Sequence, residues 1–288
     1  MFQASYVRPS REQIEKAAYT RWERRGRVHG WDAQDWLAAE MDLTFDLNYR
    51  TLLRHEFASQ VEARPELARG IRCRFCEQAP PKVRFTHARW PTPAVWGECE
   101  LVARDICDEC VEWFRTDLDP SLSSLWVTLP DQIHGASAGA RIRVPLVVFK
   151  ALSWLALSVM PEAELEHFQD TLEWVGNPDH DEDWSLITGL SCLVYSAPMP
   201  YWPAWISLER RNEDDAAIPS VLLSVASGDF CLQVPIPMGV LDQELDGEEL
   251  QLLRRASPLK GSLDIDVCRL LVPAPAAAPA RRAGRWLS

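Results

Sequence analysis

The segment CRFCEQAPPKVRFTHARWP, residues 73–91, is the most informative part of the sequence. It opens with two cysteines in a CxxC pair, and a second pair follows in CDEC at residues 107–110. Two such pairs supply four thiolates, which is the number of ligands in a closed tetrahedral zinc site. We therefore expect a structural Zn²⁺ ion, held by Cys73, Cys76, Cys107 and Cys110. The alternative is that the four thiols are reduced and carry no metal.

The composition is typical of an ordinary globular protein. Of the 288 residues, 47% are hydrophobic and 25% are charged. The longest apolar run, residues 144–161, is interrupted by Lys150 and is too short for a membrane span. The N-terminal residues lack the cationic start and apolar core of a signal peptide. We predict a cytoplasmic protein that has no membrane partner.

The net charge of −12 argues against general binding to nucleic acid, because neutralising phosphates requires clustered lysines and arginines. One local exception lies at residues 72–89, around the first cysteine pair. Basic side chains outnumber acidic ones there: Arg72, Arg74, Lys82, Arg84 and Arg89 stand against Glu77. Nucleic acid would bind only at this small basic face, and the alternative is an ordinary solvated hairpin face.

Residues 1–45 are predicted to form a helical hairpin. Ser10 and Gln13 have the spacing of a capping box at the start of the first helix. Asp32 is expected to cap the second helix, after a turn that contains two glycines. A small aromatic core is expected between the helices, made by Tyr19, Trp22 and Trp36. Residues 46–70 are predicted to continue as a linker helix.

The hairpin stretch AAYTRWERRGRVHGWDAQDWLAAEMDL, residues 17–43, also resembles a short bacterial domain of unknown function with the pattern AYxxWExRGRxxGxDxxDWLxAE. The matching positions are Ala18, Tyr19, Trp22, Glu23, Arg25, Gly26, Arg27, Gly30, Asp32, Asp35, Trp36, Leu37, Ala39 and Glu40. The resemblance implies a helical hairpin with no known chemistry. Its charged residues are expected to form a solvated face, and the alternative is a docking surface for a protein partner.

Around the cysteines, residues 82–87 and 100–106 are predicted to form two strands, and a helix is expected to start at the second CxxC pair. This order of CxxC, strand, histidine, strand, CxxC and helix resembles zinc-stapled HNH endonucleases. The resemblance implies that residues 71–120 adopt an HNH-like fold. It also implies that His87 acts as the general base on water, beside a catalytic Mg²⁺ or Mn²⁺ ion.

Two functional positions depart from the HNH pattern. Thr86 stands where that family has an acidic residue before the histidine, and Val111 stands where it has an asparagine after the last cysteine. We therefore expect an HNH-like zinc fold that has lost nuclease activity, with His87 as a structural residue. An active nuclease that uses His87 is the alternative, and so is a zinc site in which His87 or Cys99 replaces one thiolate.

Residues 145–272 are predicted to form an α+β domain. Residues 145–160 are apolar nearly all round and should form a buried helix, and an amphipathic helix is expected over 162–175. Strands are expected at 190–197, 204–211, 220–236 and 264–272. Ser227, Gly228 and Asp229 are expected to form a hairpin turn between two apolar runs. The Pro- and Ala-rich residues 273–288 are predicted to be a disordered tail.

Together these patterns predict an α+β protein: an N-terminal helical hairpin, a four-cysteine zinc centre of HNH-like type, and C-terminal helices packed on a mostly antiparallel sheet. The function most consistent with them is non-catalytic binding or scaffolding around a structural zinc ion. Two alternatives remain open. One is an HNH-type metal-dependent endonuclease, and the other is an adaptor that docks a protein partner through the hairpin.

Overall fold

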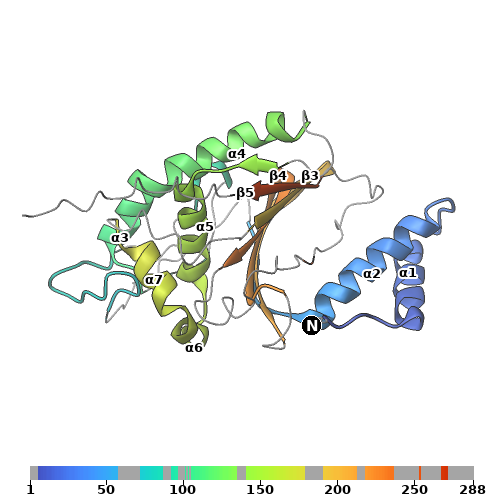
Figure 1. The fold of residues 1–288 in the computed structure, drawn as a ribbon, viewed down its shortest axis with the longest axis horizontal. Coiled ribbons are helices and arrows are strands. Elements are labelled where there is room, and N and C mark those ends of the chain that lie inside the picture. Colours follow the sequence, from blue (N-terminus) through green and yellow to red (C-terminus); the bar gives the residue numbers. More distant parts are fainter. Residues whose placement is uncertain are drawn as a thin grey trace, which may run out of the picture.

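The computed structural model describes residues 6–57, 72–86, 92–96, 101, 103, 105–134, 141–178, 191–212, 218–236, 253 and 267–271. Helices cover one side of a five-stranded sheet, and an N-terminal helix pair lies on the other side (Figure 1). This arrangement confirms the α+β class that the sequence predicts. The expected tail at 273–288 lies outside the described residues.

The N-terminal hairpin consists of α1 (Arg11–Arg24) and α2 (Asp32–Asn48). The predicted capping box is present, because the Gln13 amide donates to the Ser10 hydroxyl and the Ser10 amide donates to the Gln13 side chain. Ion pairs join the two helices, from Arg21 to Asp42 at 2.8 Å and from Arg25 to Asp35. Small apolar side chains fill the space between the helices: Ile14, Ala38 and Ala39.

Two expectations for the hairpin are wrong. Asp32 is the first residue of α2, and the N-cap is Trp31, which makes no side-chain capping bond. The Asp32 carboxylate therefore meets the helix dipole instead of capping the helix. Tyr19 is 56% exposed and belongs to no core, while Trp22 and Trp36 are only half-buried. The reason is that two helices alone bury only the faces that contact each other, so aromatic side chains on the outer faces stay exposed.

The predicted linker helix at 46–70 is also wrong in its described part. Residues 46–48 end α2, and β1 (Tyr49–Glu56) follows directly. The strand runs antiparallel to a long strand in the C-terminal half of the chain, from the Tyr49–Arg211 pair to the Glu56–Trp205 pair. The leucines and arginines of this segment favour a helix locally, but pairing with a distant strand overrides that preference. Residues 58–71 lie outside the described part of the chain.

The sheet is built around β3 (Ser191–Arg211). β4 (Val221–Ile236) runs antiparallel along one edge of β3. On the other edge, β1 pairs with the C-terminal half of β3, and β5 (Val267–Leu271) pairs with the N-terminal half. β2 (Arg141–Arg143) is parallel to β5. The sheet is therefore mostly antiparallel, as predicted, and β3 unites two strands expected at 190–197 and 204–211.

The predicted hairpin turn at residues 227–229 is wrong. Gly228 lies inside β4, opposite Tyr201 of β3, and has a φ of +59°. The register shifts on both sides of this pair, since β3 contributes more residues than β4 between neighbouring ladder positions. The glycine signal thus marks an irregularity in a continuous strand pair, where a left-handed residue is needed. Pairing continues beyond it in both directions, so the chain does not reverse here.

One helical run follows the second cysteine pair. It starts as α3 (Asp108–Trp113), passes through a π-helical segment η2 (Phe114–Leu118) and continues as α4 (Asp119–His134). A short 3₁₀ turn, η1 (Ala94–Trp96), precedes it in the chain. The start of this run at the second cysteine pair is as predicted.

The remaining helices are α5 (Leu146–Val159), α6 (Glu162–Leu165), the 3₁₀ turn η3 (Glu166–Phe168) and α7 (Gln169–Gly176). Of these, α5 packs between the preceding helical run and β4 of the sheet, and α7 packs on α5 (Figure 1). Both helical predictions for 145–175 are confirmed, with the second helix divided into three pieces. Its expected inner face, Leu165, Phe168, Leu172 and Val175, is buried. None of the helices described here has the length and apolarity that crossing a bilayer requires.

The mostly buried α5 contains one charged residue, Lys150, which is itself buried. Its ammonium donates a hydrogen bond to the carbonyl of Asn177 at 2.8 Å and lies 5.5 Å from the centre of the Trp113 ring. A buried cation requires such partners, because an isolated charge in an apolar interior is strongly unfavourable. Lys150 thus joins α5 to α3 and to the end of α7.

Candidate metal centre

The first cysteine pair lies on a tight turn, residues 73–78, which we call the first knuckle. The Cys73 amide donates to the Gln78 carbonyl at 2.8 Å, and the Glu77 amide donates to the Cys73 carbonyl at 2.9 Å. Glu77 has a left-handed φ of +57°, which reverses the chain directly after Cys76. Both thiols therefore project from one side of the turn.

The second pair, Cys107 and Cys110, forms the second knuckle at the start of α3. Cys107 is the N-cap residue, and Cys110 follows in the first turn. The Cys107 amide donates to the Cys73 sulfur at 3.4 Å, so the knuckles also touch through the backbone. A helix N-terminus favours negative charge, which suits thiolates at these positions.

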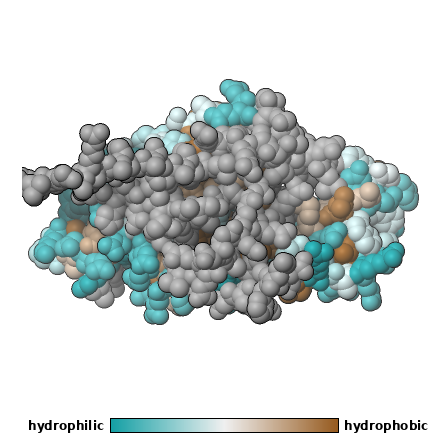
Figure 2. Space-filling model, in the orientation of Figure 1, coloured by the Kyte–Doolittle hydropathy of each residue, from teal (hydrophilic) through white to brown (hydrophobic). Residues whose placement is uncertain are grey.

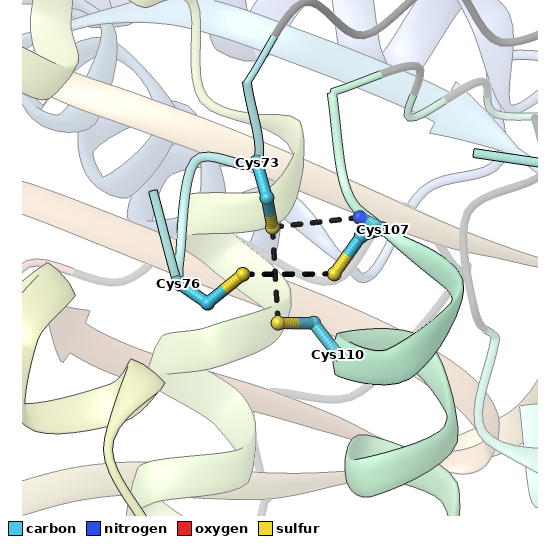
Figure 3. A group of neighbouring side chains, drawn as sticks. All are labelled: Cys73, Cys76, Cys107 and Cys110. Carbon is cyan, nitrogen blue, oxygen red and sulfur yellow. Dashed lines mark hydrogen bonds between the residues drawn. The ribbon is translucent and has the colours of Figure 1, made fainter. Parts of the chain in front are cut away.

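The four thiols converge on one point (Figure 3). Their sulfurs all lie within 4.8 Å of one another, and no other group of three or more metal-binding side chains is found in the described ranges. Two sulfur–sulfur distances cross between the knuckles, at 3.7 Å for Cys73–Cys110 and 3.7 Å for Cys76–Cys107. Cys76 is half-buried and the other three are buried. The centre is therefore closed on most sides by protein.

The four cysteine thiols lie so close together that they do not all ionise easily. The contact between the Cys73 and Cys110 sulfurs lowers the pKa of Cys73 and raises the pKa of Cys110. Burial raises the pKa of Cys107, and the neighbouring Cys73 adds to that effect. Several thiolates cannot form side by side in this space unless a cation neutralises them. The donor set fits a soft divalent ion that accepts four sulfurs.

Arg74 fastens the first knuckle to its surroundings. Its guanidinium donates to the Asp105 carboxylate, with an Nε–Oδ2 distance of 2.8 Å, and to the carbonyls of Leu157 and Met160. Those carbonyls lie at the C-terminal end of α5, where a cation is favourable. The Arg74 amide also donates to the Asp105 carbonyl at 2.9 Å. This one side chain joins both cysteine segments to α5.

Aromatic stacking anchors the same region in the main hydrophobic core. Trp154 of α5 is fully buried between two rings, Phe75 of the first knuckle at 4.6 Å and Phe114 of η2 at 4.5 Å. The Phe75 backbone also approaches Gly176 so closely that an added Cβ there would lie 2.8 Å from the Phe75 carbonyl oxygen. The cysteine centre is thus part of the core.

The structure brings together the four cysteines that the sequence selects. The other candidates, His87 and Cys99, lie outside the described residues, as do Pro91 and Arg89. The predicted strands at 82–87 and 100–106 are wrong where they can be checked, since residues 82–86, 101, 103, 105 and 106 are not in strands. Contacts with the start of α3 hold this chain instead. The Thr86 hydroxyl donates to the Asp108 carboxylate at 2.6 Å, and the Asp108 amide donates to the Arg84 carbonyl.

The expected basic face is smaller than the sequence suggests. Arg74 is half-buried in the contacts described above, and Arg84 lies 3.7 Å from Glu109. Arg74 was predicted to be a surface charge, and Phe75, Trp154 and Gly176 were not predicted to belong to the site. The sequence does hold one indication of their role. Arg74 and Phe75 are the two residues between the cysteines of the first CxxC pair, and side chains at these positions contact the elements that pack around the site.

Comparison with known families finds a match for the hairpin. Residues 9–44 match the family described as "Protein of unknown function (DUF2934)". The match confirms the resemblance of α1 and α2 to a domain of unknown function. No curated protein matches this chain, and no solved structure does. The likeness of residues 71–120 to HNH endonucleases therefore stays a hypothesis.

Proposed function

We propose that Cys73, Cys76, Cys107 and Cys110 hold one structural Zn²⁺ ion. The observation that carries this proposal is the convergence of four sulfurs within 4.8 Å. Thiolates about 2.3 Å from a tetrahedral zinc ion are separated from one another by about 3.8 Å. The two distances of 3.7 Å between the knuckles agree with that spacing. Four protein ligands leave no position for a water, which favours a structural role over a catalytic one.

The role we propose for the protein is non-catalytic binding or scaffolding. Zinc would join the first knuckle, which packs on α5 and α7, to the long helical run that starts at Cys107. Val111, where HNH enzymes place a metal-binding asparagine, is apolar and buried. The Asp108 carboxylate accepts hydrogen bonds from the Thr86 amide and hydroxyl. These features support a centre that organises the fold.

Elemental analysis of the purified chain tests the metal site. We expect one zinc per wild-type chain and a clear loss in Cys76→Ser, where the half-buried position makes misfolding less severe than at the buried ligands. Cys192→Ala is the matched control, because Cys192 is a buried cysteine on β3 and outside the centre. Wild-type protein without zinc, or a Cys76→Ser variant with full zinc content, contradicts the proposal.

Plasmid cleavage tests whether the centre is non-catalytic. Wild type and His87→Ala are incubated with Mg²⁺ or Mn²⁺, and we expect no cleavage by either. Cleavage by the wild type that disappears in His87→Ala would establish the nuclease alternative, whatever the zinc content.

A second candidate function, protein docking through the hairpin, is favoured by a separate observation. Tyr19 and Leu37 are exposed apolar side chains on α1 and α2, at 56% and 46%. Exposed large hydrophobic groups that gather in one region are typical of interaction sites. The docking role and the zinc site involve different residues, so each stands without the other.

A further inference from the structure

Exposed apolar side chains gather on one small part of the molecule. Among the described residues, the exposed large hydrophobic side chains are Val7, Tyr19, Val28, Leu37 and Val127. All but Val127 belong to the hairpin or to the segment leading into it. Figure 2 shows apolar atoms among hydrophilic ones on the hairpin side of the molecule. The concentration on residues 7–37 distinguishes this region from the rest of the described surface.

Aromatic rings extend this apolar surface. The Tyr19 and Trp22 rings are 5.3 Å apart, and the His29 ring follows at 5.7 Å from Trp22. Trp36 of α2 is half-buried. The hairpin projects from the body of the molecule and is joined to it at the end of α2 (Figure 1), where Phe45 and Tyr49 pack on Leu222. Its distal part is therefore accessible to another molecule.

The charges of the hairpin are divided between its helices. α2 contains Asp32, Asp35, Glu40, Asp42 and Asp46 and no basic residue. Residues 11–27 contain an excess of basic side chains: Arg11, Lys16, Arg21, Arg24, Arg25 and Arg27 against Glu12, Glu15 and Glu23. Within one chain the helices attract each other through Arg21–Asp42 and Arg25–Asp35. Outside these pairs, the exposed Lys16 and Arg24 of α1 are opposite in charge to the exposed Asp32 and Glu40 of α2, so α1 of one copy is complementary to α2 of another.

We propose that the hairpin associates with the hairpin of a second copy of this chain. A two-fold axis places α1 of each copy against α2 of the other, so the basic helix meets the acidic helix twice. Tyr19 and Leu37 lose their exposure to water in this contact. The proposal deepens the docking role suggested for the hairpin by naming the partner.

The size of the hairpin sets the expected strength of this association. Helices of 14 and 17 residues are about 21 and 26 Å long, and two neighbouring helices are about 20 Å wide. One face therefore offers roughly 450 Å² per copy, or about 900 Å² in total, which is below the size of stable specific interfaces and in the range of weak, transient ones. We expect a weak dimer with a dissociation constant in the micromolar range.

Sedimentation of the full chain over a wide concentration range tests the proposal. We expect wild type to dimerise, and Leu37→Glu and Tyr19→Ser each to weaken dimerisation by about tenfold or more. Val127→Glu is the matched control, because Val127 is 68% exposed on α4, and it should leave dimerisation unchanged. Circular dichroism checks that each variant keeps its helices. A monomeric wild type, or a dimer that ignores the hairpin variants, overturns the proposal.

Charge reversal tests the pairing of α1 with α2. One variant combines Lys16→Glu with Arg24→Glu, and the other combines Asp32→Lys with Glu40→Lys; all four residues are exposed. Each variant alone should dimerise more weakly than wild type, and their mixture should form a heterodimer. Failure of the mixture to associate overturns the two-fold arrangement. The docking role is tested separately by a pull-down with the tagged full-length chain. It is contradicted if Tyr19→Ser and Leu37→Glu change neither self-association nor the set of proteins that the chain retains.

Discussion

At the scale of single residues, the Arg74 side chain joins the first knuckle to Asp105 and to the end of α5. It is half-buried and binds the Asp105 carboxylate together with two carbonyls at the end of α5. Lysine keeps the charge but lacks the planar fork that serves several acceptors at once. We expect Arg74→Lys to lower the free energy of unfolding by about 1–3 kcal/mol, measured by urea denaturation.

Arg84 offers a matched comparison for this prediction. It is exposed, and it pairs with Glu109 at 3.7 Å. Surface ion pairs of this kind contribute at most about 1 kcal/mol. Arg84→Lys should therefore have little effect on the urea midpoint. If the two substitutions lower the midpoint equally, Arg74 does not have the structural role described above.

Gly176 is constrained by a neighbour and not by its own backbone. A Cβ at this position would meet the Phe75 carbonyl oxygen at 2.8 Å, so the knuckle or α7 must move to admit it. We expect Gly176→Ala to destabilise the protein by about 1–3 kcal/mol, as other overpacking substitutions do. Glu173→Ala, on the exposed side of the same helix, is the control. An unchanged urea midpoint for Gly176→Ala would contradict the close approach.

At the scale of elements, the capping box makes the start of α1 testable. The Ser10 hydroxyl accepts a hydrogen bond from the Gln13 amide at 3.2 Å. Losing this cap destabilises a helix by about 1 kcal/mol, which corresponds to about a fivefold increase in local opening. Hydrogen exchange of the α1 amides should accelerate by that factor in Ser10→Ala. Ser10→Asp keeps the cap and should exchange at the wild-type rate.

The elements that the sequence predicts well are those whose signals are local. The capping box of Ser10 and Gln13, the apolar α5 and the paired cysteines each occupy a short window, and the structure confirms the two helices and the cysteine cluster. β1 was missed because its partner, β3, is remote in sequence. The irregular pairing at Gly228 was missed for the same reason, since a glycine between apolar runs also suits a turn.

The candidate site was predictable only in part, for a similar reason. The two CxxC pairs have the same spacing, so the four cysteine ligands can be identified from the sequence alone. Nothing in the spacing shows that Phe75 and Phe114 enclose Trp154, because that stack joins three segments that are far apart in the chain. Tyr19 was expected in a core because helical periodicity places it on the same side of α1 as other apolar residues. Periodicity does not show whether another element covers that side.

At the scale of the whole molecule, removal of the proposed zinc ion should affect the two parts of the protein differently. The cysteine centre packs into the main hydrophobic core, whereas the hairpin has its own interface. We expect a strong chelator, under reducing conditions, to lower the melting temperature and to accelerate exchange of the α5 and β3 amides. The α1 amides should keep their protection. The expectation is contradicted if the α1 and α5 amides lose protection from exchange equally, or if exchange of the α5 amides does not change.

The arrangement of strands around β3 also has a consequence for how the chain folds during synthesis. β1 leaves the ribosome early, but its partner strand, β3, is synthesised much later, since Tyr49 pairs with Arg211. The N-terminal half of β3 in turn pairs with β5, at residues 267–271, which is synthesised later still. At typical rates of synthesis, β1 stays without its partner for roughly 10–30 s. The contacts of α1 and α2 with each other are local and can form at once. The nascent chain therefore presents a folded helix pair, followed by an unpaired strand, long before the sheet is complete.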